Sequence, residues 1–370
     1  MSDDRQARLA RALAKTLADE TTPLIRNAWY VAARSADVSA DKPFGRKILG
    51  ERVVMFRGGD GKPVAMKDRC AHRSFPLSES RIENGEIVCG YHGFRYDHRG
   101  RCTGVPSQAT PPQGIAVPTF KVVEQEPLIW IWMGDPVLAD EAKLPAQPWM
   151  LASHGWAGAL GYLSVESNYV HLHENLLDLT HLTFVHAKTF GTPDYASAPF
   201  ETEIDGPTIR LHRTVQPTRL PPVYARPLKM EGVDAARIVT STFVSPAMSI
   251  SAVVLRNLEL PESERVDHHI RTAQLLTPAD QDSLHYHFLI ARDFAVEDAE
   301  TTAFIHKQIV AAFHEDVEAL RLIDTVRRED RGREFLEHSV GSDRAGVAMR
   351  QLLRRLADQE NAPAPAQAAG

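Results

Sequence analysis

The stretch from Cys70 to His92 contains two matched pairs of metal-binding side chains. The first pair is Cys70-Ala71-His72 and the second is Cys89-Gly90-Tyr91-His92, with sixteen residues between them. Thiolate and imidazole ligands at these spacings can close one metal site from two short loops. Because only three cysteines occur in the chain, the presence of two of them here argues against chance placement.

A structural zinc site is the alternative interpretation of these four ligands. Zinc patterns usually group two cysteines and then two histidines, whereas each pair here combines one cysteine with one histidine. The mixed pairs favour a Rieske [2Fe-2S] cluster, in which two cysteines hold one iron and two histidines hold the other. Three cysteines do not make a disulfide framework, so we expect Cys102 to be a packed free thiol.

The composition predicts a globular protein with two domains. Its 370 residues are 43% hydrophobic, which is enough to bury a sizeable core. The formal net charge is -6 with both signs spread along the chain, so no basic face points to nucleic acid or an anionic membrane. The sequence shows neither an apolar run of bilayer-spanning length nor the apolar core of a secretory signal. We therefore expect a cytoplasmic protein with small molecules or proteins as partners.

Short β-rich runs broken by turn residues extend from Asn27 to Gly134 and predict an all-β domain. A hairpin over 52–67 leads into the first ligand pair, and the run Ile87 to Cys89 leads into the second, so both pairs should lie on loops at strand ends. A proline-containing connection over 135–148 places the domain boundary near residue 145.

The second domain mixes helices and strands, so the predicted fold class is α+β. Helical patterns occur within 166–186 and over Glu297 to Arg328, and a last helix should start at Gly341-Ser342-Asp343 and run to about residue 360. The β-type runs are 208–214, 237–256 and 284–291. At the N-terminus, residues 1–22 predict a short amphipathic helix that is either a mobile extension or an oligomer contact.

A second group of candidate ligands lies between Asn175 and His186. Asn175, Asp178 and His181 follow at three-residue steps, so on a helix they would line one face. The five residues from His181 to His186 would advance a helix by about 500° and leave the two imidazoles roughly 140° apart. Both histidines can therefore bind one metal only if the helix ends or distorts between them.

A facial triad for non-haem Fe(II) needs one carboxylate beside two histidines. Asp316 lies in the apolar stripe of the long predicted helix, where an unpaired carboxylate would be costly to bury. Its neighbours Glu315 and Glu318 fall off this stripe, and we expect them to be solvated.

Other interpretations compete with this ligand set. A single His or Asp on a half-buried helix is more often hydrogen-bonded structure than a ligand. Three further histidine pairs are rivals. His285 and His287 should point to one side of a strand and are the most serious, His268 and His269 should lie solvated in a charged loop, and the third pair is His171 with His173.

With both ligand groups in view, the chain resembles the Rieske non-haem iron oxygenases, in particular catalytic components of the kind seen in dicamba monooxygenase and vanillate O-demethylase. The resemblance covers nearly all of residues 24–356 and includes Arg26-Asn-Ala-Trp-Tyr-Val31, both Cys/His pairs, the Asn175 to His186 stretch and the carboxylate-bearing helix. It implies an all-β Rieske domain (24–145) followed by a helix-grip-like α+β catalytic domain with an antiparallel sheet (146–360). The N-terminal extension (1–23) departs from the family, as do the loops around residues 187–235, and the Ala/Pro composition of the tail (361–370) predicts disorder.

The resemblance also implies site residues. The residues that would hold the cluster are Cys70 and Cys89 on one iron and His72 and His92 on the other. The ligands of a mononuclear Fe(II) would be His181, His186 and Asp316. Asn175 matches a residue beside that iron, and Asp178 matches an acid that bridges a cluster histidine, here His92, to an iron-ligating histidine, here His181.

The implied function is that of a terminal oxygenase in aromatic compound catabolism. It would use O2 and electrons from an NAD(P)H-dependent reductase or ferredoxin to hydroxylate or O-demethylate a small aromatic or cyclic substrate, with a carboxylated one as an option. The implied assembly is a head-to-tail homotrimer. The alternatives are a cis-dihydroxylating dioxygenase of the same family, a Rieske electron carrier without oxygenase activity, a hydrophobic-ligand carrier with vestigial metals, and a zinc-stabilised structural protein.

Overall fold

The computed structural model describes residues 3–150, 155–330, 333 and 335–362. The chain divides into two compact units. The first, which we call the β unit, comprises residues 26–145 and 276–280. The second, the α+β unit, comprises residues 1–25, 146–275 and 281–370.

The β unit is built from two antiparallel sheets. The strand order of the larger sheet is β1-β10-β9-β4-β3-β2, and that of the smaller is β5-β6-β7-β8. The bounds are β1 (Trp29–Arg34), β2 (Phe44–Ile48), β3 (Glu51–Arg57), β4 (Pro63–Lys67), β5 (Arg81–Glu83), β6 (Glu86–Val88), β7 (Arg95–Tyr96), β8 (Cys102–Gly104), β9 (Thr119–Gln125) and β10 (Leu128–Trp132). β4 ends just before the first Cys/His pair and β6 just before the second, as the sequence predicts.

The core of the β unit contains both predicted cluster cysteines. Cys70 and Cys89 pack in one apolar cluster with residues from β3, β4, β6 and β7, among them Phe56, Met66 and Tyr96. The third cysteine, Cys102, is a half-buried free thiol, as predicted. Strands rich in β-branched and aromatic residues supply this core. They support the two loops that carry the Cys/His pairs.

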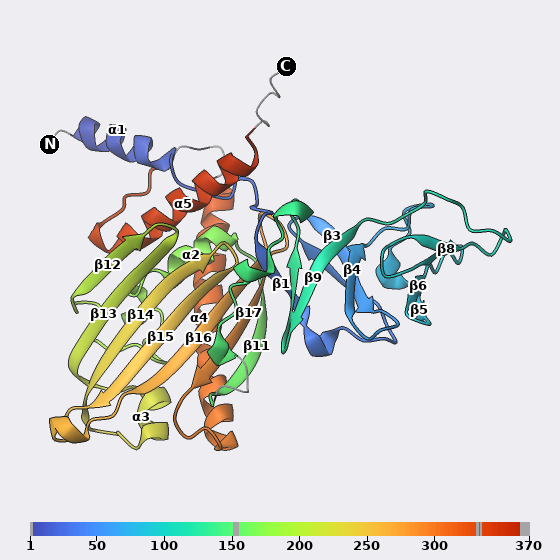
Figure 1. Cartoon of the computed structure of the whole chain (residues 1–370). Helices are drawn as coiled ribbons and strands as arrows, with labels where there is room; N and C mark the ends of the chain where they lie inside the picture. The colour runs from blue at the N-terminus through green and yellow to red at the C-terminus, as the bar shows by residue number, and fades with distance from the viewer. Residues whose placement is uncertain (1–2, 151–154, 331–332, 334, 363–370) are drawn as a thin grey trace, which may run out of the picture. The chain divides into compact units, whose positions relative to one another are not determined.

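The α+β unit is built on one large sheet with the strand order β11-β17-β16-β15-β14-β13-β12 (Figure 1). Pairing is antiparallel from β12 through to β16 and between β11 and β17. The bounds are β11 (Ala157–Val165), β12 (Phe200–Asp205), β13 (Thr208–Arg219), β14 (Asp234–Ser245), β15 (Met248–Asn257), β16 (His268–Pro278) and β17 (Leu284–Arg292). The run predicted over 237–256 is thus a hairpin of two strands.

Helices cover one face of this sheet. The long helix α4 (Ala299–Glu329) packs through Phe313 on Tyr286 and Phe288 of β17. The short helix α2 (Tyr169–Leu176) packs on β14, where the Ser241 hydroxyl donates to the Leu176 carbonyl. The remaining helices are α1 (Asp3–Ala14), α3 (Pro222–Leu228) and α5 (Arg344–Glu360). α4 and α5 confirm the two C-terminal helix predictions.

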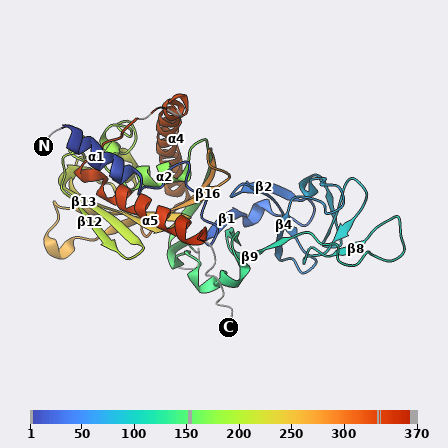
Figure 2. The ribbon, with the colours of Figure 1, turned by 90° about the horizontal axis from the view of Figure 1, so that it is seen from above.

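The segment after α1 is anchored on α5. The Ala18 backbone N–H donates to the Arg350 carbonyl at 3.0 Å, and Arg350 Nε donates to the Ala18 carbonyl at 2.8 Å. Leu17, Ala18 and Thr22 are buried. Figures 1 and 2 show α1 on the same side of the α+β unit as α5. This part of the N-terminal extension is therefore fixed on the α+β unit, while most of the predicted disordered tail (363–370) lies outside the described residues.

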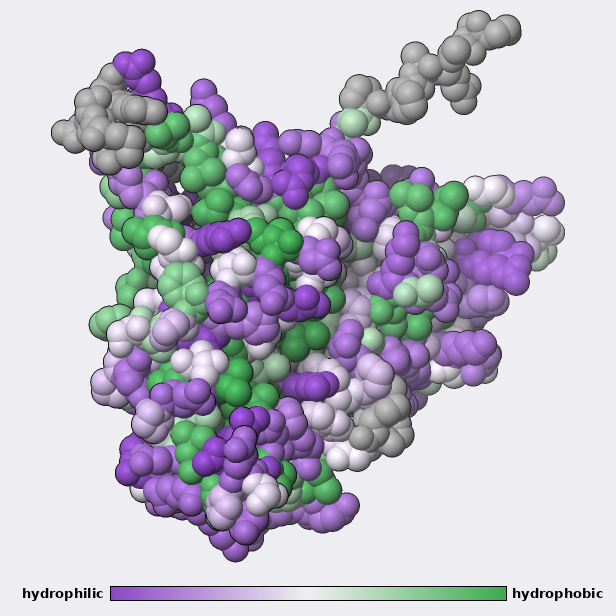
Figure 3. Space-filling view, turned by 60° about the vertical axis from the view of Figure 1, so that its left-hand side comes forward, coloured by the Kyte–Doolittle hydropathy of each residue, from purple (hydrophilic) through white to green (hydrophobic). Residues whose placement is uncertain are grey.

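Within the described part of the chain, no helix is both long enough and apolar enough to cross a bilayer. On the face shown in Figure 3, apolar residues are scattered among hydrophilic ones.

Candidate metal centres

Two loops of the β unit repeat the same backbone geometry around the predicted cluster cysteines. The Cys70 N–H donates to the Phe75 carbonyl at 2.8 Å, and the Ser74 N–H donates to the Cys70 carbonyl at 3.0 Å. The second loop repeats both bonds at the same offsets from Cys89, at 2.8 and 2.9 Å. The residue four positions after each cysteine, Ser74 or Gly93, has a positive φ (60° and 70°). Each loop therefore turns tightly around its cysteine.

At these loops, the two cysteine side chains lie in the interior of the β unit and the two histidine side chains lie at its surface. Cys70 and Cys89 are buried, whereas His72 and His92 are exposed with ring centroids 4.7 Å apart. Two buried thiols beside two paired imidazoles fit a Rieske cluster, which binds one iron through two cysteines and the other through two histidines.

Tyr96 provides a polar contact to the sulfur end of this site. Its hydroxyl lies 3.2 Å from Cys70 Sγ. Burial and the neighbouring Cys70 thiol raise the pKa of Tyr96, so the phenol keeps its proton and can donate it to the sulfur. Burial also raises the pKa of the Cys89 thiol. Ionising that thiol therefore requires a compensating positive charge, which a bound metal supplies.

The second centre lies in the α+β unit. One ligand atom from each of His181, His186 and Asp316 can be chosen so that all three lie within 4.8 Å of one another. Asp316 Oδ1 is 3.4 Å from His181 Nε2 and 3.1 Å from His186 Nε2. Among the described residues, no other group of three or more His, Cys, Asp and Glu side chains has this spacing. Two imidazoles and one carboxylate are the donor set of a non-haem Fe(II) triad.

The backbone between the two histidines is not a regular helix. α2 ends at Leu176, and His181 begins a short 3-10 turn that is followed by further turns up to residue 190. Both imidazoles can therefore reach one point, as the sequence argument requires. Because α2 ends before Asp178 and His181, the three-residue spacing of Asn175, Asp178 and His181 does not place them on one helical face. The Asp178 carboxylate accepts a hydrogen bond from the Thr180 N–H at 2.7 Å, a local contact that competes with helix continuation.

Asn175 and Asp178 lie beside this centre in different ways. Asn175 Nδ2 donates to Asp316 Oδ1 at 3.1 Å, while its Oδ1 is buried without a hydrogen-bond partner among the described residues. Asp178 Oδ2 is 3.8 Å from His181 Nδ1, an ion-pair distance that is too long for a hydrogen bond.

The charges of the centre are strongly coupled. Burial alone would lower the pKa of His181, but Asp178 and Asp316 raise it to about 9. Burial alone would raise the pKa of Asp316, but the two histidines lower it to about 2. The carboxylate is thus ionised and ready to bind a cation, and a metal must displace the proton that His181 holds.

Glu315 corrects one sequence prediction. We expected it to be solvated, but its Oε2 lies 2.9 Å from His186 Nδ1 and accepts a hydrogen bond from Thr189 Oγ1 at 2.7 Å. His186 and Thr189, in the turns that follow His181, contact Glu315 and partly cover it. Helical periodicity does not report such a tertiary contact. Glu318 is exposed and pairs with Arg321, so its prediction is confirmed.

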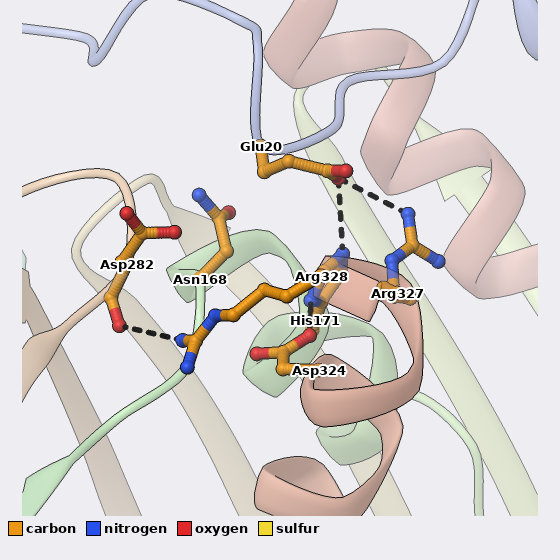
Figure 4. A pocket seen from close by; sticks show the side chains of 7 residues that line it. All are labelled: Glu20, Asn168, His171, Asp282, Asp324, Arg327 and Arg328. Atoms are coloured by element: carbon orange, nitrogen blue, oxygen red, sulfur yellow. Dashed lines mark hydrogen bonds and ion pairs between the residues drawn. The ribbon is translucent and has the colours of Figure 1, made fainter. Parts of the chain in front are cut away.

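The histidines of α2 have other partners. His171 Nδ1 lies 2.8 Å from Asp324 Oδ1, in a small polar pocket that also contains Glu20 and Arg327 (Figure 4). His173 is fully buried, and its ring nitrogens contact Ser249 Oγ at 3.0 Å and the Pro246 carbonyl at 3.1 Å. Neither histidine belongs to a three-ligand group among the described residues.

The remaining rival histidines lie on strands. His268 and His269 begin β16, so their placement in a loop is wrong. His269 Nδ1 contacts Asp293 Oδ2 at 2.6 Å. His285 lies on β17, where its Nδ1 contacts the Tyr162 hydroxyl at 3.0 Å. The ring of His287 lies 4.9 Å from the same tyrosine, which confirms that the two histidines share one side of the strand.

Two buried arginines were missed by sequence reasoning. Arg213 donates to the Tyr195 carbonyl at 2.8 Å and to Thr180 Oγ1 at 3.2 Å, and Arg237 donates to the Phe190 carbonyl at 2.8 Å. Both are almost wholly buried. They fasten the segment that carries His181 and His186 to the sheet. The available signal was an arginine at an inward position of a strand whose alternate residues are apolar.

Two known domain families match the chain. The Rieske [2Fe-2S] domain matches residues 28–121, and the vanillate O-demethylase oxygenase C-terminal domain matches residues 165–359. The first match contains all four proposed cluster ligands. The second match contains His181, His186 and Asp316.

Curated relatives and solved structures agree with these domains. The toluene-4-sulfonate monooxygenase system iron-sulfur subunit of Comamonas testosteroni is 32% identical over 91% of this chain and 98% of its own. The dicamba O-demethylase oxygenase component of Stenotrophomonas maltophilia is 31% identical over 91% and 99%. Dicamba monooxygenase bound to 3,6-dichlorosalicylic acid superimposes with a TM-score of 0.85 at 28% identity, covering 92% of this chain and 99% of that one.

The paired Cys/His loops, the largely buried His-His-Asp centre and these matches over 91% to 92% of the chain lead to one conclusion. The chain belongs to the Rieske non-haem iron oxygenases, as an oxygenase component that combines a Rieske [2Fe-2S] domain with a catalytic domain for mononuclear iron.

Proposed function

We propose that this terminal oxygenase uses O2 and electrons from a partner reductase or ferredoxin to hydroxylate or O-demethylate a small aromatic substrate. The observation that carries the proposal is the buried group of His181, His186 and Asp316 in a chain that also presents a Cys2His2 cluster site. An electron carrier needs only the cluster. A relative named for toluene-4-sulfonate, and a similar structure bound to 3,6-dichlorosalicylic acid, support an aromatic substrate that bears an acidic group.

The geometry of the ligand-bearing loops and helix supports a proposed set of site residues. We assign Cys70 and Cys89 to one cluster iron and His72 and His92 to the other, and we assign His181, His186 and Asp316 to the mononuclear iron. When bound, the cluster supplies electrons one at a time, and Fe(II) held by two histidines and one carboxylate supplies open positions for dioxygen. We propose residues 24–145 as the cluster domain and residues 146–360 as the catalytic domain.

The protein's own groups prepare this centre in three ways. Asp316 stays ionised because the two histidines lower its pKa to about 2. Asn175 donates to Asp316 Oδ1, which fixes the plane of that carboxylate. His186 and Asp316 are buried, so bulk water has little access to their ligand atoms. A charge in such a site is weakly screened, which strengthens its hold on a cation.

Asp178 connects the two kinds of site in our proposal. Its carboxylate is 3.8 Å from His181 Nδ1, and its side chain is 36% exposed, which leaves an oxygen accessible to a second imidazole. We propose a cytoplasmic homotrimer in which Asp178 accepts a hydrogen bond from His92 of the partner subunit. Such a carboxylate would orient both imidazoles and shorten the route between the metals.

Oxygen consumption coupled to product formation tests this function. The purified protein should consume O2 with NAD(P)H, a reductase and an aromatic methyl ether. One mole of ether, one of O2, two electrons and two protons should yield one mole each of phenol, formaldehyde and water. A cis-dihydrodiol without formaldehyde from an aromatic substrate would instead identify the ring-dihydroxylating alternative. Cluster reduction without substrate oxidation across a panel of aromatic acids, sulfonates and ethers would favour the electron carrier.

A further inference from the structure

Glu315 lies between the proposed iron ligand His186 and a threonine. Its Oε2 is 2.9 Å from His186 Nδ1 and accepts a hydrogen bond from Thr189 Oγ1 at 2.7 Å. The side chain is 26% exposed, whereas that of His186 is 1% exposed. The Glu315 carboxylate is therefore partly exposed, whereas the His186 imidazole with which it pairs is buried.

The other ring nitrogen of His186 faces the metal site. His186 Nε2 is 3.1 Å from Asp316 Oδ1. Because Glu315 and Asp316 are consecutive in α4, one helix presents two carboxylates to the two nitrogens of a single ring. A carboxylate can only accept a hydrogen bond. Both ring nitrogens face a carboxylate in the absence of a metal, and a metal bound at Nε2 would leave the hydrogen on Nδ1, where it is donated to Glu315.

His181 is held differently. Its Nδ1 has no direct hydrogen-bond partner among the described residues and lies 3.8 Å from Asp178. Of the two proposed histidine ligands, only His186 has its outer nitrogen fixed by a carboxylate at hydrogen-bond distance. The orientation of His186 is therefore set before a metal arrives.

We propose that Glu315 is a positioning residue for the mononuclear iron. It fixes the ring and tautomer of His186 and raises the basicity of the Nε2 atom through the imidazole. Thr189 contributes by holding the same carboxylate oxygen in place. This inference rests on the proposed assignment of His186 as an iron ligand.

Metal affinity is the first readout. Removing a carboxylate partner of a metal-bound histidine typically weakens metal binding by about 10- to 100-fold. We expect a loss of this size in Glu315→Ala and a smaller loss in Glu315→Gln, whose amide oxygen still accepts from Nδ1. Thr189→Val should also show a smaller loss. The matched control is Glu318→Gln, on the same helix, because Glu318 pairs with Arg321 and is exposed.

The titration uses full-length protein from which only the mononuclear iron has been removed. Fe(II) is added anaerobically. Far-UV circular dichroism reports that each variant is folded, and the visible absorption reports that its cluster is intact. A second readout is the EPR spectrum of the Fe(II) protein treated with nitric oxide. Its rhombicity depends on ligand orientation and basicity, so it should change in both Glu315 variants and stay at the wild-type value in Glu318→Gln.

Three outcomes distinguish this inference from the function on which it rests. Wild-type Fe(II) affinity and an unchanged EPR spectrum in both Glu315 variants would overturn the role of Glu315, as would an equal loss in Glu318→Gln. If Glu315→Ala loses the cluster absorption, the near-isosteric Glu315→Gln variant decides alone. A wild-type protein that binds no Fe(II) beyond the cluster would instead contradict the proposed iron site.

Discussion

Asp178 and His181 form a close pair without a direct hydrogen bond, with 3.8 Å between Oδ2 and Nδ1. The carboxylate has a lowered pKa because the nearby His181 and the Thr180 N–H offset its burial. It is therefore ionised at neutral pH and still able to accept a second hydrogen bond.

The Asp178→Asn variant tests the bridging role of this carboxylate. We expect both metals to stay bound, because Asp178 is not a proposed ligand, and we expect turnover to fall almost to zero. Coupled O2 consumption and iron content should be measured on the same sample. Asp205→Asn, at the exposed end of β12, is the control and should keep wild-type activity. Full activity of Asp178→Asn would exclude the bridge.

Tyr96 is expected to tune the cluster. Its hydroxyl, 3.2 Å from Cys70 Sγ, stabilises the more electron-rich reduced cluster. A neutral hydrogen bond contributes about 1 kcal/mol, which corresponds to about 40 mV for one electron. Tyr96→Phe should therefore lower the reduction potential by tens of millivolts in a spectroelectrochemical titration. Tyr91→Phe, in the exposed loop beside His92, should leave it unchanged. An equal potential for Tyr96→Phe and wild type would show that the hydroxyl does not act on the sulfur.

Arg213 is expected to stabilise the ligand-bearing segment. Arg213→Met removes the donors to the Tyr195 carbonyl and to Thr180 Oγ1, leaving buried acceptors unpaired. This should lower the free energy of unfolding by about 2 to 4 kcal/mol in urea. Arg210→Met, on the same strand with a half-exposed side chain near Glu203, should cost less than about 1 kcal/mol. Similar losses in the two variants would contradict the role of Arg213 in fastening this segment to the sheet.

His173 predicts a specific loss of stability in acid. Burial lowers the pKa of His173 to about 4, below the value of about 6.5 for an unfolded chain. The folded state therefore resists protonation. Stability is fully present above about pH 6.5 and falls as the pH drops toward 4, by up to roughly 3 kcal/mol.

The urea midpoints of wild type and His173→Gln should be compared across this range. The difference between them should shift in favour of the variant as the pH falls, because glutamine does not titrate. His338→Gln, at an exposed position, is the control. A difference that stays constant from pH 7 to pH 4 would contradict this account.

The parts of the fold that could be predicted are those with local signals. The cluster loops lie between strands with alternating or apolar patterns, so β4, β6 and the two Cys/His pairs could be located. Helix α4 has a long 3.6-residue period, in which Asp316 interrupts the apolar stripe. The structure shows Asp316 buried on the same helix as the buried residues Ile309, Phe313 and Leu320.

The parts that could not be predicted depend on contacts between distant segments. Whether α2 continues past Leu176 is decided by competing local contacts such as Asp178 with Thr180. Glu315 meets His186 across 129 positions, and Arg213 meets Tyr195 on a segment without regular structure. Periodicity reports which face of an element is buried, and it does not report the partner.

Iron and acid-labile sulfide counts in wild type and Asp316→Ala test the two-centre account most directly. Wild-type protein prepared anaerobically should contain about three irons and two sulfides per chain. Asp316→Ala should lose about one iron while keeping both sulfides and the cluster spectrum. A colourless, zinc-loaded protein without sulfide, or equal iron in the two proteins, would contradict it.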